Sequence, residues 1–101
     1  MQDHSPRIQF DKGSEGHRVV VRGVWTADAL SNPLHWKQIK QALSAPEFAD
    51  IEVEWDLTSI ERLDHTGAQL LWNTWNHKWP HRMDIGATQR IMLSRVARFS
   101  T

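Results

Sequence analysis

The sequence predicts a single α/β domain (residues 1–101) with a mixed sheet of four to five strands and helices mainly on one face. Three segments alternate between apolar and polar residues with a period of two, which is typical of half-buried strands. Helical patterns separate these strands, and this order favours parallel pairing with right-handed crossovers. A chain of 101 residues has room for one hydrophobic core and no second domain.

The first half of the chain predicts a β-hairpin followed by helical structure. It contains, in order, a short strand at residues 8–10, a glycine-containing turn at 12–16, a strand at 18–25, a helical turn at 26–30 and a helix from residue 33. Asn32 is expected to be the N-cap of this helix, and Pro33 its first residue, where a missing N–H costs nothing. Ala45 and Pro46 end it.

The second half continues the alternation of strand and helix. It contains a strand at residues 51–57, a loop at 58–63, a helix from 64 that Pro80 ends, a strand at 82–85 and a helix from about 88. The first of these helices carries Ala68, Leu71, Trp72, Trp75 and Trp79 along one side. The last carries Ile91, Met92, Val96 and Phe99 on its apolar side. It has no stop signal after it, so we expect the chain to be part of a longer protein.

Charge is balanced overall but unevenly distributed. Twelve basic and twelve acidic residues cancel, which argues against bulk electrostatic binding to nucleic acid or to an anionic membrane. Seven acids lie between residues 47 and 64, and five bases between 78 and 98. These runs are either solvated surface or a docking face. On the open face of the sheet we expect an acidic row flanked by bases: Glu52, Glu54 and Asp56, between Arg18 and Arg22 on one side and Arg82 on the other.

Several classes of site are excluded by what the sequence lacks. It has no cysteine, and therefore no disulfide, thiolate nucleophile or cysteine zinc site. It contains neither a signal peptide, nor an apolar run long enough to span a membrane, nor a nucleotide-binding glycine loop, so we expect a soluble, intracellular-type domain. His77 and His81 are four residues apart, but Pro80 breaks the helical geometry and no third ligand is in view. No metal and no cofactor are expected.

The most informative stretch is the predicted helix start from Asp64 to Gly67. Asp64 can cap the helix by accepting its first free N–H groups. Gly67 allows another surface to approach the helix closely. Thr66 presents a hydroxyl at the positive end of the helix dipole, where a phosphate is favoured. His65 lies beside Asp64, and adjacent helical residues point in different directions, so local polar structure is favoured over a general-base role.

This stretch resembles the STAS domain, in which a strand reading D-L-S/T precedes a helix start reading D-[ST]-x-G. Here the two signatures are Asp56-Leu57-Thr58 and Asp64-His65-Thr66-Gly67. Gly23-Val24-Trp25-Thr26 is similar to the G-x-W-T of the STAS domain at the N-terminus of MlaE-type ABC-transporter permeases. The resemblance extends from about residue 18 to residue 99, and implies a STAS-like fold.

The resemblance implies a non-catalytic regulatory domain of a permease for phospholipids or related hydrophobic compounds, at the cytoplasmic face of the bacterial inner membrane. The partners it implies are the transporter's ATPase or its own permease portion, with no nucleic acid and with membrane contact only through the rest of the chain. The predicted contact surface is the start of the second long helix, with Asp64 as cap, Gly67 allowing close approach, and His65 and Thr66 as exposed contacts.

A second interpretation is a stand-alone anti-sigma factor antagonist. In those proteins the serine immediately before the glycine is phosphorylated, and Thr66 holds that position here, so a kinase would switch the domain at Thr66. Permease-fused relatives often carry alanine there, and His65 stands where a small hydroxyl residue is usual, so the resemblance does not by itself imply a phosphoswitch. A third interpretation, a small hydrolase using His65 or His77, has no nucleophile placed by the sequence.

Two further groups of residues are candidates for contacts. The six tryptophans are expected mostly in the core (Trp25, Trp36, Trp55, Trp72 and Trp75), while Trp79, beside Pro80, is the expected exposed one and a partner-contact candidate. Three arginines on the last helix, Arg90, Arg95 and Arg98, are either a solvated face or, in a longer chain, contacts for lipid head groups or the ATPase subunit.

Overall fold

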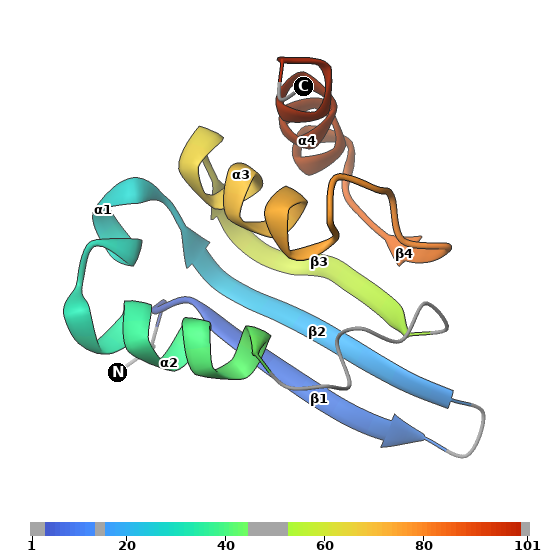
Figure 1. The fold of residues 1–101 in the computed structure, drawn as a ribbon, viewed down its shortest axis with the longest axis horizontal. Helices are drawn as coiled ribbons and strands as arrows, with labels where there is room; N and C mark the ends of the chain where they lie inside the picture. Colours follow the sequence, from blue (N-terminus) through green and yellow to red (C-terminus); the bar gives the residue numbers. More distant parts are fainter. Residues whose placement is uncertain (1–3, 14–15, 45–52, 100–101) are drawn as a thin grey trace.

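A mixed four-stranded sheet with helices on one side organises the chain (Figure 1). The computed structural model describes residues 4–13, 16–44 and 53–99. Its elements are β1 (Arg7–Gly13), β2 (Gly16–Trp25), α1 (Ala27–Leu30), α2 (Pro33–Leu43), β3 (Glu54–Leu63), α3 (His65–Thr74), β4 (Arg82–Asp84) and α4 (Ala87–Phe99). The predicted α/β class and the predicted order of elements are confirmed.

The sheet combines one antiparallel and two parallel pairings. Its strand order is β1-β2-β3-β4; β1 is antiparallel to β2, while β2–β3 and β3–β4 are parallel. The predicted hairpin is confirmed, because Gly13 of β1 faces Gly16 of β2. Each parallel connection carries helical structure, as a crossover between parallel strands requires. Residues 45 and 46, predicted to end α2, and residue 52, predicted in the acidic row, lie outside the described residues.

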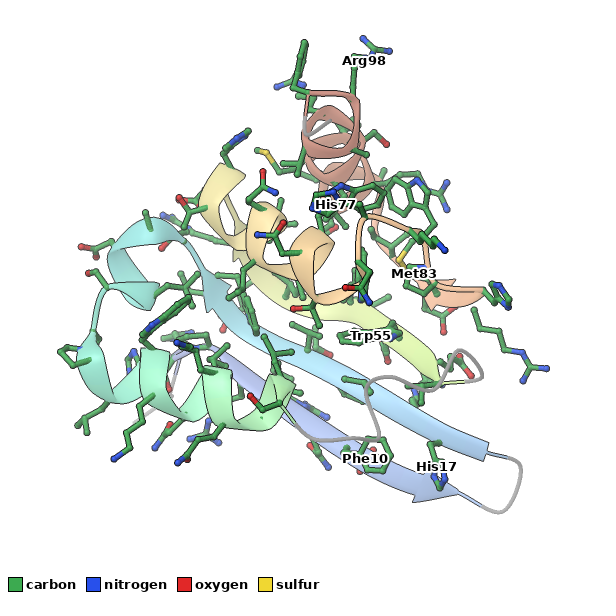
Figure 2. The ribbon with its side chains drawn as sticks, viewed as in Figure 1. Phe10, His17, Trp55, His77, Met83 and Arg98 are labelled. Atoms are coloured by element: carbon green, nitrogen blue, oxygen red, sulfur yellow. The ribbon has the colours of Figure 1, made fainter. Side chains whose placement is uncertain are left out.

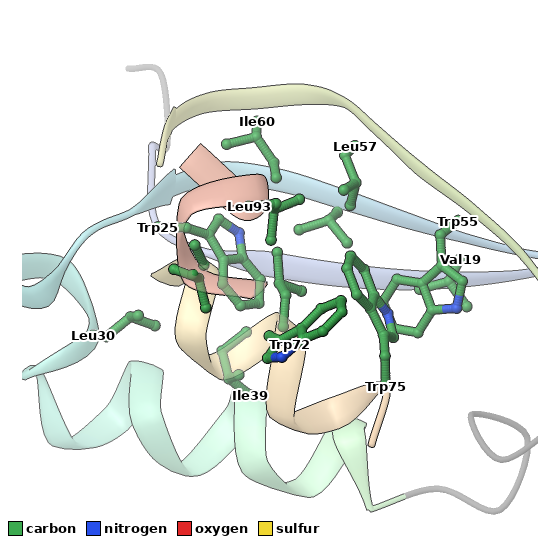
Figure 3. Close-up of a cluster of buried hydrophobic side chains, with 14 of the residues drawn as sticks. Val19, Trp25, Leu30, Ile39, Trp55, Leu57, Ile60, Trp72, Trp75 and Leu93 are labelled. Atoms are coloured by element: carbon green, nitrogen blue, oxygen red, sulfur yellow. The ribbon is translucent and has the colours of Figure 1, made fainter. Parts of the chain in front are cut away.

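The hydrophobic core fills the space between the sheet and the helices (Figure 3). Val19, Val21 and Trp25 of β2 are completely buried, as the predicted alternation requires. They pack with buried side chains of β3 and of all four described helices: Trp55, Leu57, Ile60, Leu30, Ile39, Ala68, Leu71, Trp72, Leu93 and Val96. The helices therefore share the inner face, and the outer face carries mainly polar residues around the buried Val20.

Four of the five tryptophans predicted in the core are buried there: Trp25, Trp55, Trp72 and Trp75. The prediction for Trp36 is wrong, because its side chain is 40% exposed and Lys40 Nζ lies 5.7 Å from its ring centroid. Ile39 is the buried residue of α2. α2 lies beside β1, at the edge of the sheet, and contacts the core through a narrow stripe that includes Ile39. An apolar residue outside that stripe, such as Trp36, faces solvent.

The helix predicted to run as far as Pro80 ends early. α3 stops at Thr74, and Asn76 and His77 adopt left-handed backbone angles (φ 55° and 62°) that reverse the chain. This reversal brings Trp79 back onto the helix, with its ring centroid 5.1 Å from that of Trp72. The early end of α3 therefore goes together with the packing of Trp79 against Trp72.

Two predicted details of the second half are also wrong. The loop expected at residues 58–63 is strand, because β3 remains paired with β2 as far as Trp25↔Leu63, with register shifts near Arg22 and Gly23 that absorb the irregularity. In α4, Ile91 and Phe99 are 57% and 76% exposed, and the buried residues are Leu93 and Val96. Of the four residues predicted on the apolar side, Val96 is buried, and the face that contains Leu93 and Val96 contacts α3 and β3.

A three-carboxylate network around Arg18 stabilises the outer face of the sheet. The Arg18 guanidinium donates to Asp56 (2.7 Å), Glu54 (3.2 Å) and Asp84 (3.3 Å). Glu54 lies between Arg18 and Arg82 in the register, as predicted, whereas Arg22 faces Ser59. The hydrogen bond to Asp56 raises the pKa of Arg18 against the opposing effect of burial. Burial acts to raise the pKa of Asp56, but hydrogen bonds from Thr58 and Arg18 outweigh it, and the pKa is lowered.

The lowered pKa of Asp56 predicts a pH-dependent contribution to stability. The folded carboxyl titrates below its ordinary value of 3.8, so this contribution is complete above that value and is lost as the pH falls through the folded pKa. We expect Asp56→Asn to lower the free energy of unfolding by about 1 kcal/mol at neutral pH. The difference from the parent should shrink between about pH 5 and pH 2 in urea titrations. A difference that stays constant over that range would contradict the proposed role of the charge.

Candidate functional site

The Asp64 carboxylate joins the starts of two helices. Its Oδ1 accepts a hydrogen bond from the Gly67 N–H (3.0 Å), which makes Asp64 the N-cap of α3. Its Oδ2 accepts one from the Ala27 N–H (2.8 Å), at the first residue of α1. Two free N–H groups at two helix N-termini are thus satisfied by one side chain. The predicted cap on α3 is confirmed, and the second bond to α1 is a contact that sequence spacing does not reveal.

Gly67 brings α3 into close contact with the end of β2. It is buried, and a Cβ at this position would overlap the Trp25 carbonyl oxygen and lie 2.9 Å from the Trp25 carbonyl carbon. The same carbonyl oxygen accepts a hydrogen bond from the Asp64 N–H (3.2 Å). The surface that Gly67 allows to approach is therefore the chain's own backbone. Gly67 contributes to the site by holding α3 against the end of β2, and it offers no surface of its own.

His65 and Thr66 are the exposed residues of this helix start. Both lie in the first turn of α3, directly after the capping Asp64, and both are exposed. Asp64 is half-buried between them and the end of β2. The backbone beneath the two side chains is held by the cap and by the close contact with Trp25. Two polar side chains are thus presented to solvent from a fixed support.

An open groove adjoins this helix start. It has a volume of about 630 Å³ and is lined by Thr26, residues 61–64 and residues 86–89. These residues follow or end β2, β3 and β4, so the groove lies at the carboxyl edge of the three parallel strands. That edge is where ligands and partners of open α/β sheets commonly bind. Arg62 is exposed in its lining, and Gln89 donates a hydrogen bond to the Ile60 carbonyl (3.2 Å).

Trp79 belongs to a different part of the surface. It is 40% exposed, as the sequence predicted, but it follows the C-terminal end of α3, whereas His65 and Thr66 lie at the N-terminal end. A helix of ten residues spans about 15 Å, so the structure does not bring these contact candidates together. Trp79 instead joins an aromatic cluster with Trp55, Trp72 and Trp75, in which neighbouring rings meet at centroid distances of 5.1 to 6.4 Å.

The two histidines considered as catalytic groups have different surroundings. His77 is stacked on the Trp72 ring, and its Nε2 lies 3.0 Å from Asn73 Oδ1 (His77 and Trp55 are labelled in Figure 2). His65 stands exposed at the helix start. Within the described residues, no group of three or more His, Cys, Asp or Glu side chains is placed to hold a metal ion. None of the described helices is both long and apolar enough to cross a bilayer.

Residues of the groove are the part of the site that sequence reasoning missed. Thr26 carried a signal, because a threonine directly after a strand is a common N-cap, and its Oγ1 does accept from the Ala29 N–H (3.3 Å). Gly86 and Gln89 carried no signal, because only the parallel pairing of β3 with β4 brings them to the same groove as Leu63.

No protein-family model, curated protein or solved structure matches this chain.

The double role of Asp64 predicts a graded response to substitution. Asp64→Ala removes both acceptors, and we expect the free energy of unfolding to fall by about 2 kcal/mol or more. Asp64→Asn keeps one acceptor oxygen, but it turns an NH₂ group toward the other N–H, so we expect an intermediate loss. Denaturant titrations of the three proteins measure the order. Equal stability of the asparagine variant and the parent would contradict the two-helix cap.

The close contact at Gly67 predicts that even one methyl group is too large there. Alanine is ordinarily about 1 kcal/mol more favourable than glycine inside a helix, but the clash with the Trp25 backbone should reverse the sign. We expect Gly67→Ala to destabilise the protein by about 1–3 kcal/mol. Thr66→Ala, at the neighbouring exposed position, is the matched control and should change stability by less than about 0.5 kcal/mol. A more stable Gly67→Ala protein would refute the contact.

Proposed function

We propose that this chain is a STAS-like docking domain and that it regulates a transporter without catalysing a reaction. In this proposal it forms the N-terminal part of an MlaE-type ABC-transporter permease for phospholipids or related hydrophobic compounds. It acts at the cytoplasmic face of the bacterial inner membrane, and its partner is the transporter's ATPase or the permease portion. The surface that docks is the start of α3 with the adjoining groove.

One observation carries the proposal: two exposed polar side chains stand on a helix start whose backbone is fixed from inside. His65 and Thr66 have no capping duty, since Asp64 performs it, and Gly67 anchors the helix against Trp25. A docking surface gains affinity when its contact residues are already held in the bound arrangement, because less conformational entropy is lost on binding. The groove of about 630 Å³ beside them offers a recess for partner side chains.

The charges around this surface fit a polar contact. Glu61, Arg62 and His65 are exposed at or beside the groove. Charged groups at the rim of an interface affect association rate and partner choice more than affinity. The proposed surface can therefore discriminate between partners while remaining reversible, as a regulatory contact requires.

Exposure of the Thr66 hydroxyl favours a second candidate function, that of an anti-sigma factor antagonist switched by phosphorylation. A phosphate on Thr66 would lie at the N-terminal end of α3, where the helix dipole favours negative charge. It would also lie close to the Asp64 carboxylate, which repels it. Such a group adds a charge of about −1.5 to −2 and would change any surface docked there.

Substitutions at the two exposed residues test the docking surface. We expect His65→Glu or Thr66→Asp to weaken partner binding or transport while leaving the melting temperature nearly unchanged, because neither side chain supports the fold. A photo-reactive residue at position 65 should cross-link to the ATPase or to the permease portion in native membranes. The same residue at Gln41, exposed on α2, is the control and should not. Unchanged affinity in both variants would refute the proposed surface.

The size of the native polypeptide separates the two candidates. An antibody to this domain should detect, in the inner-membrane fraction, a band several times larger than 11.8 kDa. A free band near that mass, with phosphate transferred to Thr66 by a kinase and none to a Thr66→Val variant, would instead support the anti-sigma factor antagonist.

A further inference from the structure

β1 forms one edge of the described sheet, and the side of β1 that faces away from β2 is called its outer side below. β1 pairs with β2 along its full length without a register shift, and the strand order leaves no described strand on its other side. Edge strands commonly carry proline, lysine or bulges that prevent further pairing, or are very short. β4, at the opposite edge, has three residues, whereas β1 has seven, with no proline and one lysine near its end. β1 is therefore long and without a bulge, and the charges of Arg7 and Asp11 are its main protection against further pairing.

An open groove runs along this edge. Its volume is about 720 Å³, and it is lined by residues 6–9 of the β1 region, by Arg22, and by Gln38, Ile39 and Ala42 of α2. In Figure 1, α2 follows the first half of β1, while the half that leads to the hairpin extends beyond the end of α2. Phe10 lies on this farther half, with His17 of β2 beside it (Figure 2; ring centroids 5.2 Å apart).

The sequence of β1 is complementary to itself when read in the opposite direction. In an antiparallel pair centred on Gln9, Arg7 faces Asp11 of the second copy, and Asp11 faces Arg7 of the second copy. Between them, Ile8 faces Phe10 of the second copy on the helix side of the sheet, where both residues pack against the core. Gln9 and Asp11 share the outer face, since Gln9 Nε2 donates to Asp11 Oδ1 (3.0 Å). Opposite charges and apolar pairs in directly facing positions stabilise strand pairing.

Arg7 lies opposite Arg22 in the β1–β2 register, on the outer face of the sheet. The antiparallel pairing of two β1 strands places Asp11 of the second copy beside Arg7 on that face. The contact occurs twice in a symmetric pair, as in any isologous interface.

The helices are compatible with this symmetry. In an antiparallel pair, the first half of one β1 lies beside the second half of the other. Since α2 follows the first half of its own strand, the two α2 helices are staggered along the shared edge. Each groove of about 720 Å³ then receives the neighbouring strand.

We propose that two copies of this chain associate through β1 and so join their four-stranded sheets into one continuous sheet. This interface is independent of the docking surface at the start of α3, so either proposal can fail without the other. Sedimentation velocity of the 101-residue chain should show a concentration-dependent species of twice 11.8 kDa. A chain that remains monomeric at its highest soluble concentration overturns the proposal.

Charge reversal tests the register. Arg7→Asp or Asp11→Arg converts both cross-copy charge contacts to repulsion and should weaken the dimer about tenfold or more. The double variant Arg7→Asp/Asp11→Arg restores opposite charges and should recover the dimer. Mixing the two single variants should yield a heterodimer, because one then carries acids at both positions and faces bases at both positions of the other. Arg95→Asp, an equal change of charge on the exposed face of α4, is the control and should leave the dimer unchanged.

A dimer that both single charge reversals leave intact would use another surface and would overturn the proposal. Hydrogen exchange on the parent chain gives a test that needs no variant. Amides on the outer side of β1 should exchange faster on dilution, while those of β2 and β3 should not change. Exchange in β1 that is independent of concentration would equally overturn the interface.

Discussion

The hydrogen bonds of the Asp64 carboxylate hold together the starts of α1 and α3, and the arrangement of the domain depends on them. One side chain accepts from the N–H groups of Ala27 and Gly67, at the starts of α1 and α3. The backbone N–H of Asp64 donates to the Trp25 carbonyl, at the end of β2. A strand end and two helix starts therefore meet at one residue. The absence of a side chain at Gly67 makes the meeting possible, since a Cβ there would overlap the Trp25 backbone.

This internal duty divides the predicted site into supporting and exposed residues. Asp64 and Gly67 hold the backbone in place, and His65 and Thr66 are left to face solvent beside the groove at the carboxyl edge of the sheet. The four residues from Asp64 to Gly67 therefore include both supporting and exposed residues, and the sequence motif alone does not distinguish the two. Trp79 shows the converse: its exposure was expected, yet it lies beyond the other end of α3 and belongs to an aromatic cluster with Trp72 and Trp75.

Different interactions stabilise the two faces of the sheet: aromatic packing on the inner face and ion pairs on the outer face. The inner face is dominated by tryptophans packed at large angles, such as Trp55 and Trp75 at 80° and Trp72 and Trp75 at 82°, an arrangement that aromatic rings favour. Within the described part of the chain, the indole N–H groups of Trp72 and Trp75 are buried, and no protein acceptor lies within hydrogen-bond distance of them. On the outer face, Arg18 forms ion pairs with three carboxylates, those of Glu54, Asp56 and Asp84.

Local rules in the sequence determined the order of elements, the helix starts at Asn32 and Asp64, and the buried side of β2, because capping and period-two alternation act over a few residues. Tertiary contacts decided the rest. Whether residues 58–63 form a loop or a strand depended on pairing with β2, and the early end of α3 goes together with the packing of Trp79 against Trp72. The exposed side of α4 depended on its contact with α3, and the second bond of Asp64 joined residues 37 positions apart. Only folding brings groups so distant in the sequence together, so a pattern within a few neighbouring residues could not predict these contacts.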